Sequence, residues 1–67
     1  MEITLNDNKH TISENTSLYE IVFSQLGDKQ KGVAVAVNDS VIPKSNWENH
    51  LLNANDTILI IKATQGG

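Results

Sequence analysis

Apolar positions along the chain come in short runs separated by turn-forming residues, a pattern that predicts several strands around one helix. Residues 2–5 alternate between polar and apolar side chains, which indicates a half-buried strand. The cluster at residues 6–8 favours a turn, after which residues 9–12 can return as the second strand of a hairpin. The hairpin side chains that we expect to face the core are Ile3, Leu5 and Ile12.

The next segment carries the signals of a helix over residues 17–26. Ser17 and Glu20 have the spacing of a capping box, in which each side chain accepts a hydrogen bond from the other residue's backbone N–H. Gly27 is suited to end the helix, because glycine adopts a left-handed conformation at no steric cost. The apolar stripe expected to face the core consists of Leu18, Ile21, Val22 and Leu26.

The second half of the chain predicts further strands. The β-branched run at residues 33–37 is typical of a strand, and residues 41–42 form a short strand that a proline ends. Residues 44–49 are expected to form a turn or a short helical segment, in which Trp47 is a structural plug over the sheet edge. Residues 57–62 are expected to be the last strand.

The order of the predicted elements is strand, strand, helix, strand, short strand, strand. One helix with one apolar stripe covers only one face of a sheet, so the hairpin and the final strand must share the sheet beneath it. We therefore expect an α+β fold of the β-grasp (ubiquitin-like) type, a mixed sheet of four to five strands with one main helix on one face. We expect residues 1–62 to form this domain and residues 63–67 to be a flexible C-terminal tail.

Alternation along the last strand predicts a second apolar surface. Leu59 and Ile61 point to the face opposite to that of Ile58 and Ile60. Because a single helix leaves one sheet face open, we expect Leu59 and Ile61 to form an exposed patch of the kind that binds a protein partner. The alternative is that the loop carrying Trp47 and Leu51 covers them.

Composition narrows the class of partner. The net charge is −3 and the basic residues are five scattered lysines, which disfavours nucleic-acid binding because phosphate contacts need a clustered basic patch. The absence of cysteine excludes disulfides and agrees with a reducing cytoplasm, where we expect the protein to reside. The start of the sequence does not resemble a signal peptide and no apolar run could span a bilayer, so we expect no membrane association.

No catalytic constellation is evident in the sequence. His10 and His50 have no carboxylate or second histidine at ligand spacing, so we expect them to be surface or packing residues and no metal site to form. No glycine-rich loop follows a strand as a phosphate site requires, and no close carboxylate pair occurs. We therefore expect a chain that is not itself an enzyme and binds no cofactor.

The terminal pair Gly66-Gly67 is the strongest functional signal. Two glycines add nothing to a core, but they present a bare carboxylate on a thread thin enough to enter a narrow channel. A carboxylate is a poor electrophile until another enzyme activates it. The tail thus indicates a protein that is itself a substrate, and an incidental Gly-Gly is the alternative.

A family resemblance rests on residues 35–47, which read Val-Ala-Val-Asn-Asp-Ser-Val-Ile-Pro-Lys-Ser-Asn-Trp. This segment resembles the middle of the ThiS-type sulfur carriers of thiamine biosynthesis, in which a strand ending in asparagine leads to a turn, a proline, a basic residue and a tryptophan. Residues 52–58 and the Gly-Gly terminus are similar to that family as well. Two positions depart from it: Lys44 stands for the usual arginine, and Asn55 for the usual glycine.

The resemblance implies a sulfur-carrying cycle. An E1-like, ThiF-type adenylyltransferase would use ATP to adenylate the Gly67 carboxylate, with Gly66 keeping the tail narrow enough for access. Sulfur from a donor such as a cysteine desulfurase would then convert Gly67 to a thiocarboxylate, which a ThiG-type thiazole synthase would consume. The residues expected to contact these partners are Leu59, Ile61, Lys62 and Gln65.

Other readings use the same tail. A MoaD-type carrier for molybdopterin is usually longer and tends to have a proline pair before its Gly-Gly, where this chain has Lys62-Ala63-Thr64-Gln65. A ubiquitin-like modifier joined to lysines of other proteins needs the same terminus, and the sequence separates it poorly from a carrier. A plain binding module with an incidental Gly-Gly is the third alternative.

Overall fold

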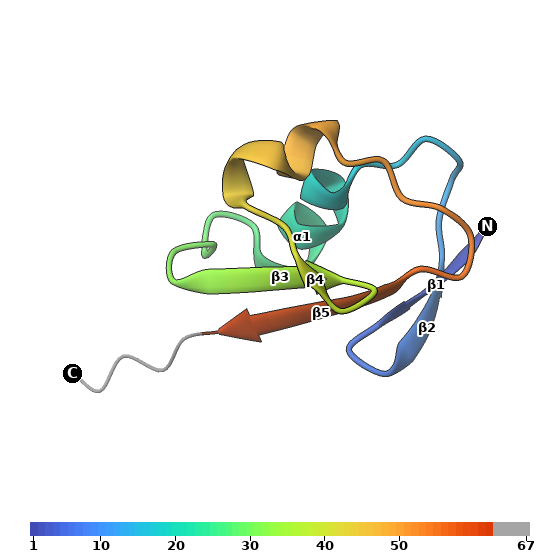
Figure 1. Cartoon of the computed structure of the whole chain (residues 1–67), viewed down its shortest axis with the longest axis horizontal. Helices are drawn as coiled ribbons and strands as arrows, with labels where there is room; N and C mark the ends of the chain where they lie inside the picture. Colours follow the sequence, from blue (N-terminus) through green and yellow to red (C-terminus); the bar gives the residue numbers. More distant parts are fainter. Residues whose placement is uncertain (63–67) are drawn as a thin grey trace.

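A computed structural model describes residues 1–62, which form five strands, one α-helix and one 3-10 helix (Figure 1). In chain order the elements are β1 (Glu2–Leu5), β2 (Asn8–Thr11), α1 (Leu18–Leu26), β3 (Val33–Val37), β4 (Ser40–Val41), the 3-10 helix η1 (Lys44–Asn49) and β5 (Thr57–Lys62). The expectation of a flexible tail at residues 63–67 lies outside this part of the chain.

The strands form one mixed sheet in the order β2-β1-β5-β3-β4. β1 and β5 run parallel, and the other neighbouring strands run antiparallel. α1 and η1 lie over the same face of this sheet, and no helix of the described part covers the other face (Figure 1). The predicted mixed sheet with one main helix on one face is confirmed.

Two short hairpin turns set the strand register. Asn6 and Asp7 have φ of 47° and 71°, and Asn38 and Asp39 have φ of 50° and 72°. Positive φ at both central residues is the type I′ geometry whose twist matches that of the flanking strands, and Asn and Asp tolerate it. Because each loop holds only two residues, β2 and β4 both begin one residue earlier than the sequence pattern predicts.

Both ends of α1 carry the capping residues that the sequence predicts. The Ser17 side-chain oxygen accepts from the Glu20 backbone N–H at 3.2 Å, and Glu20 Oε2 accepts from the Ser17 N–H at 2.8 Å. Gly27 follows at a φ of 58°, and its N–H donates to the carbonyl of Phe23 at 2.7 Å. These contacts satisfy backbone groups that a helix end leaves free, so the capping box stabilises the helix where the chain leaves the loop.

The core lies between the sheet and the helical layer. Its buried apolar residues are Ile3, Leu5, Leu18, Ile21, Val22, Val35, Val37, Trp47, Leu52 and Ile58. Trp47 is 1% exposed, and its indole Nε1–H donates to the carbonyl of Ile42 at 2.8 Å, which satisfies the polar atom of this ring inside the core. Ile12 was predicted to face the core and is only partly buried, because it lies just beyond the end of the edge strand β2.

A buried carboxylate ties the β3–β4 turn to the start of β5. Asp56 is 7% exposed, and its two oxygens accept from Asn38 Nδ2 at 2.9 Å and from the backbone N–H of Asn53 at 2.8 Å. Asn38 Oδ1 in turn accepts from the N–H of Thr57 at 2.9 Å. This network joins segments 18 residues apart in sequence, so it holds β5 in register beside β3.

We expect Asp56→Ala to lower the free energy of unfolding by about 2 kcal/mol, because the substitution leaves two part-buried donors without an acceptor. Urea denaturation of the two proteins measures the difference. The matched control is Glu14→Ala, which removes a carboxylate from an exposed loop position and should change stability by less than about 0.5 kcal/mol. An equal effect of both substitutions would contradict the structural role of Asp56.

Candidate functional site

The open face of the sheet carries the predicted apolar patch. Along β5, Ile58 is fully buried beneath the helical layer, whereas Leu59 is 47% exposed and Ile61 is 49% exposed. The predicted exposure of these two side chains is confirmed. The alternative, in which the loop of Trp47 and Leu51 covers them, is wrong: Trp47 is buried in the core, and Leu51 is itself 52% exposed.

Strand pairing extends this patch across three strands. Leu59 lies opposite Ala36 and Ile61 lies opposite Ala34, and small alanine side chains leave the larger aliphatic ones uncovered. Ala36 also pairs with Val41 of β4, which is 68% exposed. We call the surface formed by Ala34, Ala36, Val41, Leu59 and Ile61 the open-face patch. Sequence reasoning missed Val41, although the two-residue turn before it would have placed it opposite Ala36.

Polar side chains border the open-face patch on the side of β1 and β2. Thr57, at the start of β5, pairs with Thr4 of β1, which pairs in turn with Lys9 of β2. Lys9 and Glu2 form an exposed ion pair at 3.9 Å. An apolar centre with a polar rim is the usual anatomy of a surface that binds another protein.

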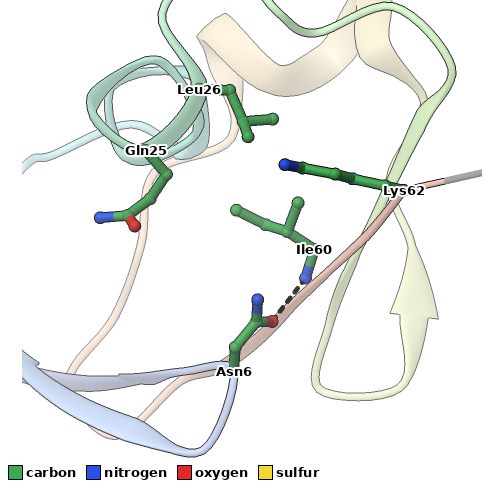
Figure 2. Close-up of a pocket in the computed structure, with 5 residues that line it drawn as sticks. All are labelled: Asn6, Gln25, Leu26, Ile60 and Lys62. Atoms are coloured by element: carbon green, nitrogen blue, oxygen red, sulfur yellow. Dashed lines mark hydrogen bonds between the residues drawn. The ribbon is translucent and has the colours of Figure 1, made fainter.

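Lys62 lies apart from the two residues with which the sequence analysis grouped it. It pairs with Val33 at the end of β5, and alternation puts it on the helix side of the sheet with Ile58 and Ile60. There it lines a shallow cleft of about 310 Å³ together with Asn6, Gln25, Leu26 and Ile60 (Figure 2). Strand alternation alone could have separated Lys62 from Leu59 and Ile61.

Three of the predicted site residues, Gln65, Gly66 and Gly67, lie outside the described residues. Lys62 is the last described residue; it ends β5 at the cleft, and Ile61 before it belongs to the open-face patch. The three described residues that were predicted to bind partners are thus divided between two faces of the sheet, with Leu59 and Ile61 on one face and Lys62 on the other.

The histidines lie on separate elements. His10 is on β2, and His50 follows η1, where its backbone carbonyl accepts from the N–H of Leu18 at 2.8 Å. Within residues 1–62, no group of three or more His, Cys, Asp or Glu side chains could hold a metal ion. Over the same range, no helix has the length and apolar character needed to cross a bilayer.

Comparison with known proteins identifies the family to which the chain belongs. The model of the ThiS family matches residues 1–67, which is the whole chain. The chain belongs to the ThiS family. It is 30% identical to the sulfur carrier protein ThiS of Escherichia coli (strain K12) over 67 residues, with full coverage of both chains.

Two solved structures of a ThiS protein from Geobacter metallireducens have the same fold at 19% sequence identity. The crystal structure has a TM-score of 0.84 with full coverage of both chains. The solution structure has a TM-score of 0.77 and covers all of this chain and 88% of the other. The predicted ubiquitin-like β-grasp fold is confirmed.

The ThiS family comprises sulfur carriers of thiamine biosynthesis, and this is the general role of the chain. A sulfur carrier is a substrate of other enzymes rather than a catalyst, and it interacts with enzymes that activate it and transfer sulfur. The residues that carried the family resemblance serve mainly the fold: Asn38 forms a turn and Trp47 fills the core. Asn55, which replaces the usual glycine, has the φ of 70° that this turn requires.

Proposed function

We propose that this ThiS-family chain carries sulfur as a thiocarboxylate on Gly67. In the proposed cycle, an oxygen of the Gly67 carboxylate attacks the α-phosphate of ATP and releases pyrophosphate, leaving an acyl-adenylate. The outer sulfur of a persulfide donor then attacks the acyl carbon and displaces AMP, which gives an acyl disulfide with the donor. A second thiol attacks the donor's inner sulfur, so the S–S bond breaks and leaves a thiocarboxylate on Gly67 and a disulfide between the two thiols. The thiol thereby supplies the two electrons that the transferred sulfur gains. The observation that carries this proposal is the family match over residues 1–67, which includes the terminal Gly66-Gly67.

The partners supply the reactive groups of this cycle. A ThiF-type adenylyltransferase binds ATP, a donor such as a cysteine desulfurase provides the sulfur, and a ThiG-type thiazole synthase consumes it to build the thiazole ring. The chain contributes no acid, base, metal or cofactor of its own. Its lack of cysteine agrees with a cycle that runs in a reducing cytoplasm.

The carrier contributes a docking surface and a narrow tail. Leu59 and Ile61 of the open-face patch are the residues proposed to bind the activating enzyme, because exposed large aliphatic side chains gain most from being covered. Gly66, and Gln65 before it, are proposed to lead the carboxylate into the active site. Any side chain at positions 66 or 67 would widen the thread and misplace the reacting atom.

The test is the intact mass of the protein after incubation with ATP, a sulfur donor and the cognate ThiF-type enzyme. A mass increase equal to the replacement of one oxygen by sulfur, located at Gly67 by fragmentation, is the expected result. A parallel reaction without ATP should leave the mass unchanged. An unchanged mass with an enzyme that demonstrably releases pyrophosphate would overturn the proposal, and isopeptide-linked products would instead identify a protein modifier.

A further inference from the structure

The cleft beside the start of the tail has a mixed lining. Leu26, from the end of α1, and Ile60, from β5, contribute apolar side chains that are partly buried against the core. Asn6, Gln25 and Lys62 contribute the polar groups, and they come from the β1–β2 turn, the helix and the last strand (Figure 2). We call this hollow the tail-base cleft.

The polar groups of the tail-base cleft favour a negatively charged group. Asn6 Oδ1 accepts from the backbone N–H of Ile60 at 2.8 Å, and within residues 1–62 the amide nitrogen of Asn6 has no acceptor (Figure 2). The exposed Gln25 amide makes no hydrogen bond within residues 1–62; its oxygen lies on the cleft side in Figure 2, and a half-turn of the amide brings its NH2 group there as a donor. Lys62 extends its ammonium group across the cleft in the same view.

The charge of Lys62 is uncompensated in this part of the chain. The ion pair of residues 1–62 joins Lys9 to Glu2, and no carboxylate of these residues lies within 4.0 Å of the Lys62 ammonium. Leu26 and Ile60 line the cleft beside it, and the Lys62 side chain itself is exposed, so its attraction to an incoming charge is that of a solvent-accessible pair and depends on salt. A hollow of about 310 Å³ is at the small end of ligand sites and suits a single side chain.

We propose that the tail-base cleft receives a carboxylate side chain of the activating enzyme that takes up the tail. The inference rests on the proposed function, because an enzyme that holds the Gly67 carboxylate must pass along the start of the tail, one residue beyond Lys62. The cleft lies on the face opposite to the open-face patch. The enzyme therefore contacts both faces of β5. It makes apolar contacts with the open-face patch and a charge-assisted hydrogen bond in the tail-base cleft.

The test measures the Kd of the cognate ThiF-type enzyme for four variants by titration calorimetry. Lys62→Glu reverses the charge in the cleft, Lys62→Gln removes it, and Gln25→Glu adds a negative charge to its opposite wall. The matched control is Lys44→Glu, which makes the same charge change at an exposed lysine that does not line the cleft. Thermal unfolding of each variant confirms that it is folded.

We expect Lys62→Glu to raise Kd about fivefold or more at low salt, with smaller increases for Lys62→Gln and Gln25→Glu. The difference in Kd between Lys62→Glu and the wild type should become smaller near 0.5 M salt, because interactions between charges more than about 4–5 Å apart are then largely screened. Equal Kd values for Lys62→Glu and Lys44→Glu would overturn the proposal, because the effect would then reflect net charge alone. A raised Kd for Lys62→Glu together with an unchanged Kd for Gln25→Glu would mean that the carboxylate of the enzyme lies outside the cleft. That result would also overturn the proposal.

The mass of the wild-type protein after the sulfur-loading reaction separates this inference from the proposed function. Sulfur loading of the wild type together with an unchanged Kd for Lys62→Glu would overturn the cleft proposal alone. A wild-type protein that binds the enzyme but gains no sulfur would overturn the proposed function, whatever the variants show.

Discussion

Deletion of Gly67 is expected to abolish sulfur loading and leave the domain as stable as before. The shortened chain still ends in a glycine carboxylate, but that carboxylate reaches about 3.5 Å less far from the domain. Displacement of a reacting atom by about 1 Å can cost on the order of 100-fold in rate, so a full-residue displacement should reduce loading by at least that factor. The position of the terminal group, rather than its chemical nature, is what the deletion changes.

The expected stability follows from the location of the core. Within residues 1–62, the buried apolar side chains extend from Ile3 to Ile58 and precede the tail. Calorimetric unfolding of both proteins should therefore give melting temperatures that agree, while the mass assay separates them. A variant with one added glycine after Gly67 is the matched control, since it displaces the carboxylate in the opposite direction. Wild-type loading of either variant would contradict the role of the Gly67 carboxylate.

Leu59→Glu and Ile61→Glu are each expected to raise the Kd for the activating enzyme more than tenfold and to change stability little. Side chains at the centre of a protein interface cost about 2 kcal/mol or more when lost, and a carboxylate there must also be stripped of water. The folded monomer tolerates the change because Leu59 is 47% and Ile61 is 49% exposed. Val41→Glu, at the β4 edge of the open-face patch, should act in the same direction.

A substitution at the neighbouring Ile58 should have the opposite effect, lowering stability without changing the Kd. Ile58 lies beside Leu59 in sequence but is fully buried. Ile58→Val should lower the free energy of unfolding by about 1 kcal/mol through the lost methylene, with an unchanged Kd for the folded protein. Binding is measured by titration calorimetry and stability by urea denaturation. A large loss of stability for Leu59→Glu with unchanged affinity would show that this side chain belongs to the core.

Local signals account for the parts of the fold that the sequence predicted well. The capping box of Ser17 and Glu20 involves residues within one helical turn, so it forms as soon as the helix does. Alternation in β5 predicts opposite faces for Ile58 and Leu59, because successive strand residues always point to opposite sides. The predicted starts of β2 and β4 were wrong by one residue. The pattern showed a polar cluster before each strand, but not the two-residue loop that sets the register.

The open-face patch could be predicted from the sequence, and the tail-base cleft could not. Leu59 and Ile61 could be placed on the open face because the sequence predicts one amphipathic helix, which covers only one face of the sheet. Lys62 was predicted to bind the same partners as these two residues, although strand alternation puts it on the face of Ile60. The tail-base cleft had no sequence signal, since Asn6, Gln25 and Lys62 are brought together only by the packing of three elements.

The sequence by itself determined the order of elements, most of the core and the Gly66-Gly67 terminus, because these depend on residue types and on spacing within one element; of the residues predicted to face the core, Ile12 and Leu26 are only partly buried. Only the tertiary structure decided which strands are neighbours. The parallel pairing of β1 with β5 places the Asn6 turn beside the end of the chain's last strand. Contacts between residues 54 positions apart depend on burying a shared core, and no local pattern encodes that arrangement.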